Sequence, residues 1–290
     1  MKPNTNIPTE LLNNKNDFTE PYFKQFPLRT AARPLQLTRD ISKDYLFPTF
    51  YGDVSCSLAV FLCDYQAALT LLPKSSMKPV KMPGGRALVT ISCYEYKKVL
   101  GVKPYNEIAV TIPIQINPSI DIPLLPMLAE KLFSGFGYHV IHMPVTSLEN
   151  QIRGLKIWGL PKVVNDIDIS INNNISTTVA TDEQGNDYLR LEIPTQGKIT
   201  AFNVRSNLYS VLNDEMKQSE TCFKGSFNVT KNLGQLFGMA DYEHTALTLG
   251  KGEQADLLRS LQINPVPFQT RYCERMNACF DLPNPKFIQK

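Results

Sequence analysis

One lysine, Lys162, lies in an apolar stretch that also contains the only tryptophan of the chain. Residues 154–164 read GLKIWGLPKVV, so Lys162 follows a Leu-Pro pair and precedes two valines. An amine carried into an apolar site loses its hydration, which favours the neutral form, and a neutral amine can attack a ketone. The residues alone leave two interpretations open. Either Lys162 is a nucleophile, or its ammonium reaches solvent at the start of a strand while Trp158 fills the core.

Residues for other kinds of catalysis are sparse. Among the three histidines is an H-x-x-H pair, His139 and His142, on a strand-like segment. Residues three apart on a strand face opposite sides, so we expect one core and one surface histidine rather than a metal site. The sequence contains neither the G-x-S-x-G elbow of a serine hydrolase nor a glycine-rich phosphate-binding loop. We therefore expect no metal and no organic cofactor.

Length, charge and cysteine content exclude several classes of protein. The 290 residues are 43% hydrophobic and 20% charged, which is typical of a globular protein. The net charge of +3 comes without a basic cluster, so no nucleic-acid partner is expected. Six cysteines without C-x-x-C spacing predict free thiols in a reducing compartment. No segment resembles a signal peptide or a transmembrane helix, so we expect a cytoplasmic protein without a membrane partner.

Strand patterns dominate the sequence from residue 54 onward. Residues 54–63, 87–96 and 107–116 are rich in Val, Ile, Leu, Thr and aromatic residues, as strands are. Residues 163–172 and 189–193 alternate apolar and polar side chains with the period of two expected of a half-buried strand. Turn-forming residues separate these two segments, which favours an antiparallel meander over alternating βαβ units.

Helical segments are fewer and shorter. Asp64 is placed to cap a helix that ends before Pro73, a second helix is expected over residues 126–133, and a third over 253–261. Together the elements predict an α+β fold of predominantly antiparallel β structure, in which a curled or closed, barrel-like sheet carries peripheral helices.

The first residues differ in composition from the rest. Residues 1–35 are rich in Asn, Pro and Thr, and we expect an N-terminal arm laid over the surface of a single domain that spans residues 36–290. Isolated aromatic residues in this arm, such as Phe18 and Phe23, are expected to be exposed and to serve as anchors of a subunit interface.

Two motifs carry a family resemblance. Residues 154–164, with WGLPK at their centre, resemble the active-site signature of the acetoacetate decarboxylase family, in which the lysine after proline forms a Schiff base. Residues 105–110, YNEIAV, resemble the tyrosine-x-glutamate segment of that family, whose glutamate lies in the active site. The resemblance extends over roughly residues 50–260. It implies an acetoacetate decarboxylase-like fold, the Schiff-base role for Lys162 and an active-site carboxylate for Glu107.

The sequence also departs from that family. Val163 stands where its best-known members have a second lysine, so desolvation must activate Lys162; acetoacetate decarboxylase is itself a known example of activation by desolvation or by a neighbouring cation. Val54 falls where the family has an arginine that helps bind the substrate carboxylate, and Thr90 or Ser92 where it has a second glutamate. The residues expected to bind substrate are Tyr105, Trp158, Leu160 and Arg86.

The resemblance implies a reaction and an assembly. The reaction is decarboxylation of a small β-keto acid, most directly acetoacetate to acetone and carbon dioxide, through an imine on Lys162. Two alternatives stay open: a Schiff-base aldolase or dehydratase acting on another keto acid, and a β domain that binds a small ligand without turnover. The partner is then a small keto acid, and the family implies a homo-oligomer built from dimers.

Overall fold

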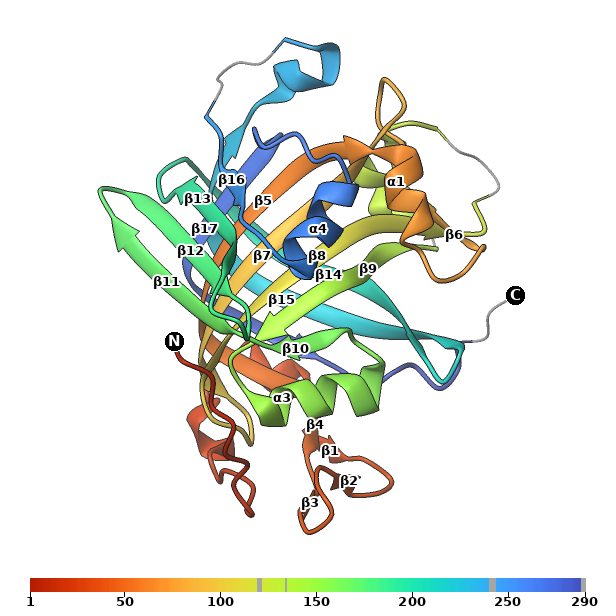
Figure 1. Cartoon of the computed structure of the whole chain (residues 1–290). Coiled ribbons are helices and arrows are strands. Elements are labelled where there is room, and N and C mark those ends of the chain that lie inside the picture. Colours follow the sequence, from red (N-terminus) through yellow and green to blue (C-terminus); the bar gives the residue numbers. More distant parts are fainter. Residues whose placement is uncertain (119–121, 134, 240–243, 288–290) are drawn as a thin grey trace.

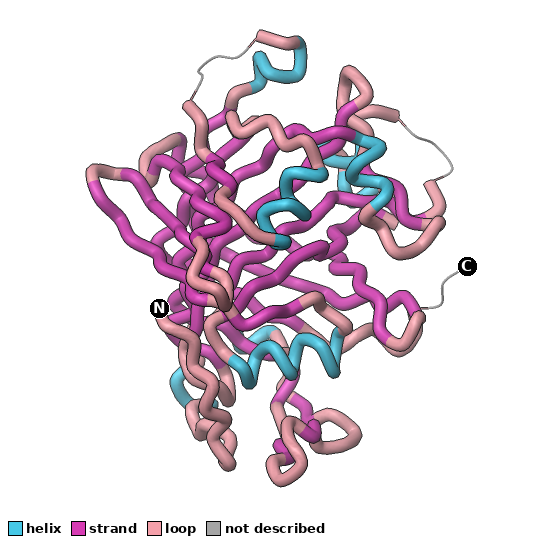
Figure 2. The backbone as a smooth tube through the Cα atoms, in the orientation of Figure 1, coloured by secondary structure: helices cyan, strands magenta, loops and turns pink. Residues whose placement is uncertain are grey.

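A computed structural model of the chain describes residues 1–118, 122–133, 135–239 and 244–287, with a β-barrel at its centre (Figure 1 and Figure 2). In this part of the chain seven strands form the barrel in the order β9-β14-β15-β17-β5-β7-β8, and pairing of β8 with β9 closes it. Neighbouring strands are antiparallel except β9 and β14, which pair in parallel. The barrel strands are β5 (Thr49–Asp64), β7 (Arg86–Val99), β8 (Tyr105–Ile116), β9 (Phe136–Val145), β14 (Lys198–Leu212), β15 (Glu215–Lys231) and β17 (Gln269–Phe280).

A second sheet covers one side of the barrel, on the left in Figure 1. Its strands are β11 (Asp166–Asn172), β12 (Ile175–Thr181), β13 (Asp187–Pro194) and β16 (Leu247–Leu249). The first three pair antiparallel in sequence order, so the predicted meander is confirmed. Its apolar face packs on the outside of β7 and β8, which is why β8 is buried on both faces and reads as a nearly continuous apolar run.

The predicted helices are present, and one is shorter than expected. Asp64 accepts a hydrogen bond from the Ala67 backbone amide and caps α1 (Tyr65–Thr70), as its sequence position indicates. The segment 126–133 forms only α2 (Leu125–Leu128) and a 3-10 turn. The other elements are α3 (Leu148–Arg153), the π-helical turn Gly154–Trp158, α4 (Glu253–Ser260), and 3-10 turns at Lys15–Asp17, Phe23–Gln25, Glu130–Leu132 and Leu233–Phe237.

Several very short strands complete the fold, and most lie at the lower end of the barrel in Figure 1. There α3 lies across the barrel end, and paired segments near residues 29–47 lie below it. The short strands are β1 (Arg29–Thr30), β2 (Leu35–Gln36), β3 (Ser42–Lys43), β4 (Leu46–Phe47), β6 (Met77–Pro79) and β10 (Lys162–Val164). The predicted α+β class, with a curled or closed, predominantly antiparallel sheet and peripheral helices, is thus confirmed, and the sheet is closed.

Two expectations about single residues are wrong. Phe18 and Phe23 are not exposed: they are 8% and 2% accessible and pack with Phe50 in an aromatic cluster that fixes the first residues to the barrel. His139 and His142 are both buried. A register shift between β8 and β9 breaks the alternation in this segment, so Tyr138, Val140 and Met143 line the interior while both histidines are covered from outside.

The six cysteines are free and buried in the structure. Among the described residues, no helix is long and apolar enough to cross a bilayer.

Candidate active site

The barrel encloses a cavity of about 430 Å³. Its walls are mainly apolar and aromatic, as in typical small-molecule sites, and a few polar side chains enter it. Lys162 and Glu107 are two of these polar residues. Lys162 begins β10, which lies beside α3 (Figure 1), and Glu107 lies near the start of β8. Apolar lining residues include Leu58, Val60, Val140, Met143, Phe202, Val204 and Phe223.

Lys162 and Glu107, 55 positions apart in sequence, form a buried pair in this cavity. Lys162 Nζ donates to Glu107 Oε2 over 2.5 Å, and the two side chains are only 7% and 4% accessible. The Tyr96 hydroxyl donates to the other carboxylate oxygen, Oε1, over 3.1 Å. Both carboxylate oxygens therefore have a donor, and the Lys162 amine is directed at a proton acceptor inside an apolar space.

The turn before Lys162 places its side chain. α3 continues into the π-helical turn Gly154–Trp158, a local widening that often occurs at functional sites. Gly159 then reverses the chain at φ +67°, and a Cβ there would lie 2.1 Å from the Val211 carbonyl oxygen, so only glycine fits. After Pro161 the chain enters β10, which pairs in parallel with β9 and sets Lys162 opposite Met143.

Gly154 is needed for a different reason. The stem of Lys162 lies directly on it, and a Cβ at residue 154 would be 2.4 Å from Lys162 Cδ. The two ends of the GLKIWGLPK segment therefore contact each other, which explains why a glycine and the lysine are needed eight positions apart.

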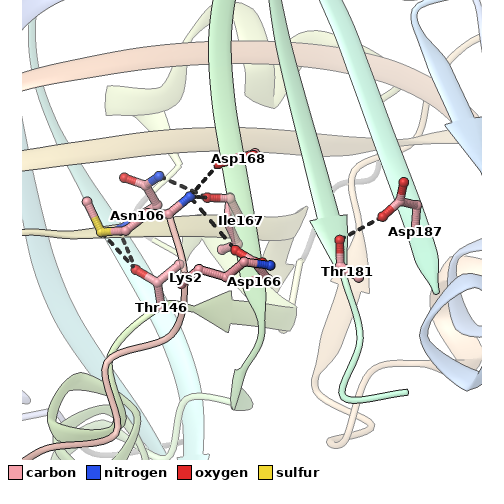
Figure 3. A network of polar contacts seen from close by, with 9 residues as sticks. Lys2, Asn106, Thr146, Asp166, Ile167, Asp168, Thr181 and Asp187 are labelled. Atoms are coloured by element: carbon pink, nitrogen blue, oxygen red, sulfur yellow. Dashed lines mark hydrogen bonds and ion pairs between the residues drawn. The ribbon is translucent and has the colours of Figure 1, made fainter. Parts of the chain in front are cut away.

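Hydrogen bonds fix Asn106, the residue that precedes Glu107 in β8. The Asn106 backbone amide donates to Thr146 Oγ1 over 2.9 Å, and the Asn106 side-chain amide donates to the Ile167 carbonyl over 3.1 Å (Figure 3). In the same network the Lys2 ammonium pairs with Asp166 at 2.6 Å. The two Asn106 contacts tie the start of β8 to β11 and to the segment after β9, and the Lys2 pair ties the N-terminal residues to β11.

Tyrosines form the wall around the pair. Tyr51 and Tyr96 line the cavity, and the Tyr105 ring lies 5.7 Å from Lys162 Nζ. Burial raises the pKa of Tyr51 to about 12 and raises the pKa of both Tyr96 and Tyr105 well above their usual value. All three hydroxyls therefore stay protonated near neutral pH and act as hydrogen-bond donors.

The structure brings most of the sequence-predicted residues together. Trp158 and Leu160 line the cavity beside Lys162 and Glu107. Trp158 stacks on Phe280 at 4.8 Å, so it also fills the core, as the alternative interpretation supposed. Tyr105 does not line the cavity, but it lies behind Lys162.

Arg86, the remaining residue expected to bind substrate, does not line this cavity. Its guanidinium donates to the backbone carbonyls of Pro83, Gln235 and Leu236 and ties the start of β7 to a neighbouring loop. Thr90 and Ser92 line the cavity. The sequence places Arg86 at the start of a predicted strand. In the fold, its guanidinium binds backbone carbonyls and so fixes a loop rather than a substrate.

Asn150 and Arg153 also line the cavity, although no motif of the sequence indicates them. Both are buried in α3, at 2% accessibility each. One feature of the sequence could have indicated Arg153, since it directly precedes the motif that begins at Gly154. A buried arginine in a short helix has, however, no pattern that separates it from an exposed one. Among the described residues, no three His, Cys, Asp or Glu side chains are placed to share a metal ion.

Comparisons with known proteins agree with this architecture. The family model for acetoacetate decarboxylase matches residues 32–214. The structure of acetoacetate decarboxylase from Legionella pneumophila subsp. pneumophila str. Philadelphia 1 has a TM-score of 0.54 at 12% identity, over 98% of this chain and 97% of that chain. Another acetoacetate decarboxylase structure has a TM-score of 0.53 at 13% identity, over 81% and 87%.

A third solved structure extends the range of ligands found on this fold. It is the enduracididine biosynthesis enzyme MppR complexed with pyruvate, with a TM-score of 0.50 at 11% identity, over 81% of this chain and 88% of that chain. At such low identities the likeness shows the fold alone. No curated protein sequence matches the chain.

Proposed function

The chain belongs to the acetoacetate decarboxylase family, and we propose that it decarboxylates a small β-keto acid, most directly acetoacetate, through an imine on Lys162. The observation that carries this proposal is the buried Lys162–Glu107 pair, which lines the cavity with 2.5 Å between Nζ and Oε2. A lysine that serves only solubility or surface charge has no need of such a position.

Transfer of one proton within the pair, from Lys162 to Glu107, creates both a nucleophile and an acid. Ammonium with carboxylate, and amine with carboxylic acid, have the same total charge and differ by one proton moved along the Nζ to Oε2 hydrogen bond. In the second form, Lys162 has a free lone pair and Glu107 holds a proton to deliver. Tyr96 remains as the donor to Oε1 in both forms.

The reaction then follows in balanced steps. Lys162 Nζ attacks the ketone carbon, and one proton of the amine passes to the oxygen to give the carbinolamine. Glu107 then protonates this hydroxyl, which leaves as water, and an iminium forms. The carboxylate leaves as carbon dioxide, and the electron pair of the broken C–C bond moves into the iminium to give an enamine. A proton that Glu107 takes from solvent is added to the enamine carbon, and water hydrolyses the resulting iminium to release the methyl ketone and free Lys162.

The cavity supports this chemistry by excluding water. Its lining is largely apolar, so an iminium and a carboxylate in it interact with fixed side chains rather than with bulk solvent. A closed barrel suits this requirement because the interior is reached only at its ends.

A second candidate uses the same iminium for addition to, or elimination from, another keto acid. Two observations favour it. A solved structure of this fold, MppR, is complexed with pyruvate, an α-keto acid that has no β-carboxylate to lose. The cavity of about 430 Å³ also falls in the range of about 300–1,000 Å³ that holds drug-sized ligands, which leaves room for a second reactant beside a four-carbon acid.

Product analysis distinguishes these functions. The purified protein is incubated with acetoacetate, and acetone and carbon dioxide are measured against the spontaneous rate. We expect release of both by the wild type, none above background by Lys162→Ala, and wild-type release by Lys156→Ala, an exposed lysine in the same segment. Consumption of keto acid without carbon dioxide would support the second candidate. Binding without any turnover would contradict both and leave a ligand-binding domain.

A further inference from the structure

We propose that Arg153 binds the carboxylate of the substrate and so makes this site selective for keto acids over neutral ketones. This role for Arg153 rests on the proposed imine at Lys162, because Arg153 would bind the carboxylate of the same molecule whose ketone Lys162 attacks. It concerns a residue that the two motifs do not contain.

Arg153 is a buried cation that forms no ion pair with any residue that the structure describes. Its side chain lines the cavity, and the residue is 2% accessible. Among the described residues, no carboxylate lies within 4.0 Å of its guanidinium. Its contacts are neutral: Nη1 donates to Asn150 Oδ1 over 2.9 Å, Nη2 donates to Thr49 Oγ1 over 3.0 Å, and Nε has no partner among those residues. A buried charge is expensive unless it is paired, so the site is complete only with an anion.

The nearest acidic side chain in sequence is already used. Glu149 Oε1 accepts from Lys43 Nζ over 2.7 Å and from the Tyr45 hydroxyl over 2.5 Å. Tyr45 in turn supports Arg153, whose guanidinium carbon lies 4.4 Å from the centre of its ring. The stack and the two neutral acceptors fix the guanidinium before any ligand binds, and such preorganisation favours binding.

Arg153 also lies next to the proposed nucleophile. The residue that follows it, Gly154, is in contact with the Lys162 side chain. The charge of Arg153 acts on the hydroxyls of Tyr51 and Tyr105, and the Tyr105 ring lies beneath Lys162 Nζ. In a β-keto acid only one carbon separates the ketone from the carboxylate, so an anion held by Arg153 presents its ketone to Lys162.

The other arginine of the cavity is less suited to this role. The Arg271 guanidinium stacks on Phe202 at 4.8 Å, and its Nε donates to Gln269 Oε1. The electrostatic neighbours of Arg271 are Tyr138 and Glu130 rather than the tyrosines around Lys162. Arg153 is therefore the cation that shares a wall with the lysine.

The test compares an acid with its neutral analogue of the same size. Imine formation at Lys162 is trapped with borohydride, using acetoacetate and acetoacetamide, in the wild type, Arg153→Gln and Arg153→Lys. Removing one partner of a buried charge pair typically lowers affinity by about 30-fold or more. We expect Arg153→Gln to lower trapping of acetoacetate by this factor and to leave trapping of acetoacetamide within about threefold. Arg153→Lys keeps the charge but not the planar fork, so a smaller loss is expected. Equal losses with both compounds, or no loss with either, would overturn the proposal.

A second measurement separates failure of this inference from failure of the proposed function. Binding of 3-hydroxybutyrate, which has the carboxylate but no ketone, is measured by calorimetry in the wild type, Arg153→Gln and Lys162→Ala. We expect binding to be lost in Arg153→Gln and kept in Lys162→Ala, even if no ketone forms an imine. Undiminished binding to a folded Arg153→Gln variant overturns the role of Arg153 whatever Lys162 does. If Arg153→Gln does not fold, Arg153→Lys provides the same comparison, with partial loss expected and unchanged binding contradicting the inference.

Discussion

At the scale of single residues, the proposed mechanism makes Glu107 the residue that limits how fast Lys162 can act. Its two carboxylate oxygens are held by different donors, Lys162 and Tyr96, so the carboxylate has one orientation relative to the amine. A proton carrier fixed within one hydrogen bond of the nucleophile serves each step in which a proton is gained or lost. Glu107 is therefore expected to govern turnover more than substrate binding.

Replacement of Glu107 tests this division of roles. Glu107→Gln keeps the size of the side chain but cannot accept the Lys162 proton, and loss of general acid–base catalysis lowers rates by about 10²–10⁴-fold. We expect kcat for acetone release to fall by that factor. Tyr96→Phe removes only the donor to Oε1 and is expected to lower kcat less. A Glu107→Gln enzyme with wild-type kcat would exclude the proton-carrier role.

The residue scale is also where the sequence was most and least informative. Lys162 and Glu107 belong to two short motifs, and the structure brings them into contact. Arg86 and Arg153 were indistinguishable as isolated charges, and only the fold shows that one binds backbone carbonyls and the other lines the cavity. The partner of a charged side chain depends on tertiary packing, which local sequence does not encode.

At the scale of elements, the π-helical turn between α3 and β10 positions the lysine. The Lys162 stem lies against Gly154, and there is no space between them for a methyl group. Any side chain at residue 154 must move Lys162 away from its present contact with Glu107.

Gly154→Ala is therefore expected to impair chemistry more than stability. The added Cβ would lie 2.4 Å from Lys162 Cδ, which a shift of the flexible lysine can relieve. We expect imine formation to fall at least about tenfold, equivalent to 1.4 kcal/mol, with the melting temperature nearly retained. The matched control is Leu155→Ala, an exposed position in the same turn. Unchanged imine formation in Gly154→Ala would show that the contact does not position Lys162.

The register shift between β8 and β9 buries His142, and this burial leads to a prediction about pH. Burial lowers the pKa of His142 to about 4 from 6.5 in the unfolded chain. Between these two pH values the unfolded state binds more protons, so the free energy of unfolding falls as the pH falls from 6.5 to 4, by roughly 3 kcal/mol for this residue.

The variant His142→Gln removes this contribution. We expect its free energy of unfolding, measured by urea denaturation, to decline less steeply than that of the wild type between pH 6.5 and 4. The exposed His244→Gln serves as the control and is expected to keep the wild-type slope. The same slope in His142→Gln and the wild type would contradict the burial of a neutral His142.

The elements themselves were largely predictable because their patterns are local. The runs at 54–63, 87–96 and 107–116 lie within β5, β7 and β8, and Asp64 caps α1 as expected. The closure of β8 on β9 and the parallel pairing of β9 with β14 join distant segments and leave no periodic signal. The register shift between β8 and β9, which turns both histidines outward, was likewise not predictable from local sequence, because it depends on how the two strands pair.

At the scale of the whole molecule, the cavity is larger than a four-carbon acid requires. Its volume is about 430 Å³, and much of its wall is apolar, including Phe202, Val204 and Phe223. Each buried CH₂ group contributes about 0.8 kcal/mol. Unfilled apolar space in the barrel therefore favours longer substrates.

A chain-length series tests this use of space. We expect kcat/KM for 3-oxohexanoate, which has two more CH₂ groups than acetoacetate, to be higher by roughly tenfold, the effect of burying both groups. Initial rates of carbon dioxide release from the two acids provide the measurement. A lower kcat/KM for the longer acid would show that the apolar part of the cavity does not receive the substrate.

Borohydride reduction can trap the proposed imine on Lys162. The protein is incubated with acetoacetate and borohydride, its intact mass is measured, and the modified peptide is mapped. We expect one reduced adduct per chain on the peptide that contains Lys162, and none in Lys162→Ala. An unmodified wild-type protein, or an adduct that persists in Lys162→Ala, would contradict it.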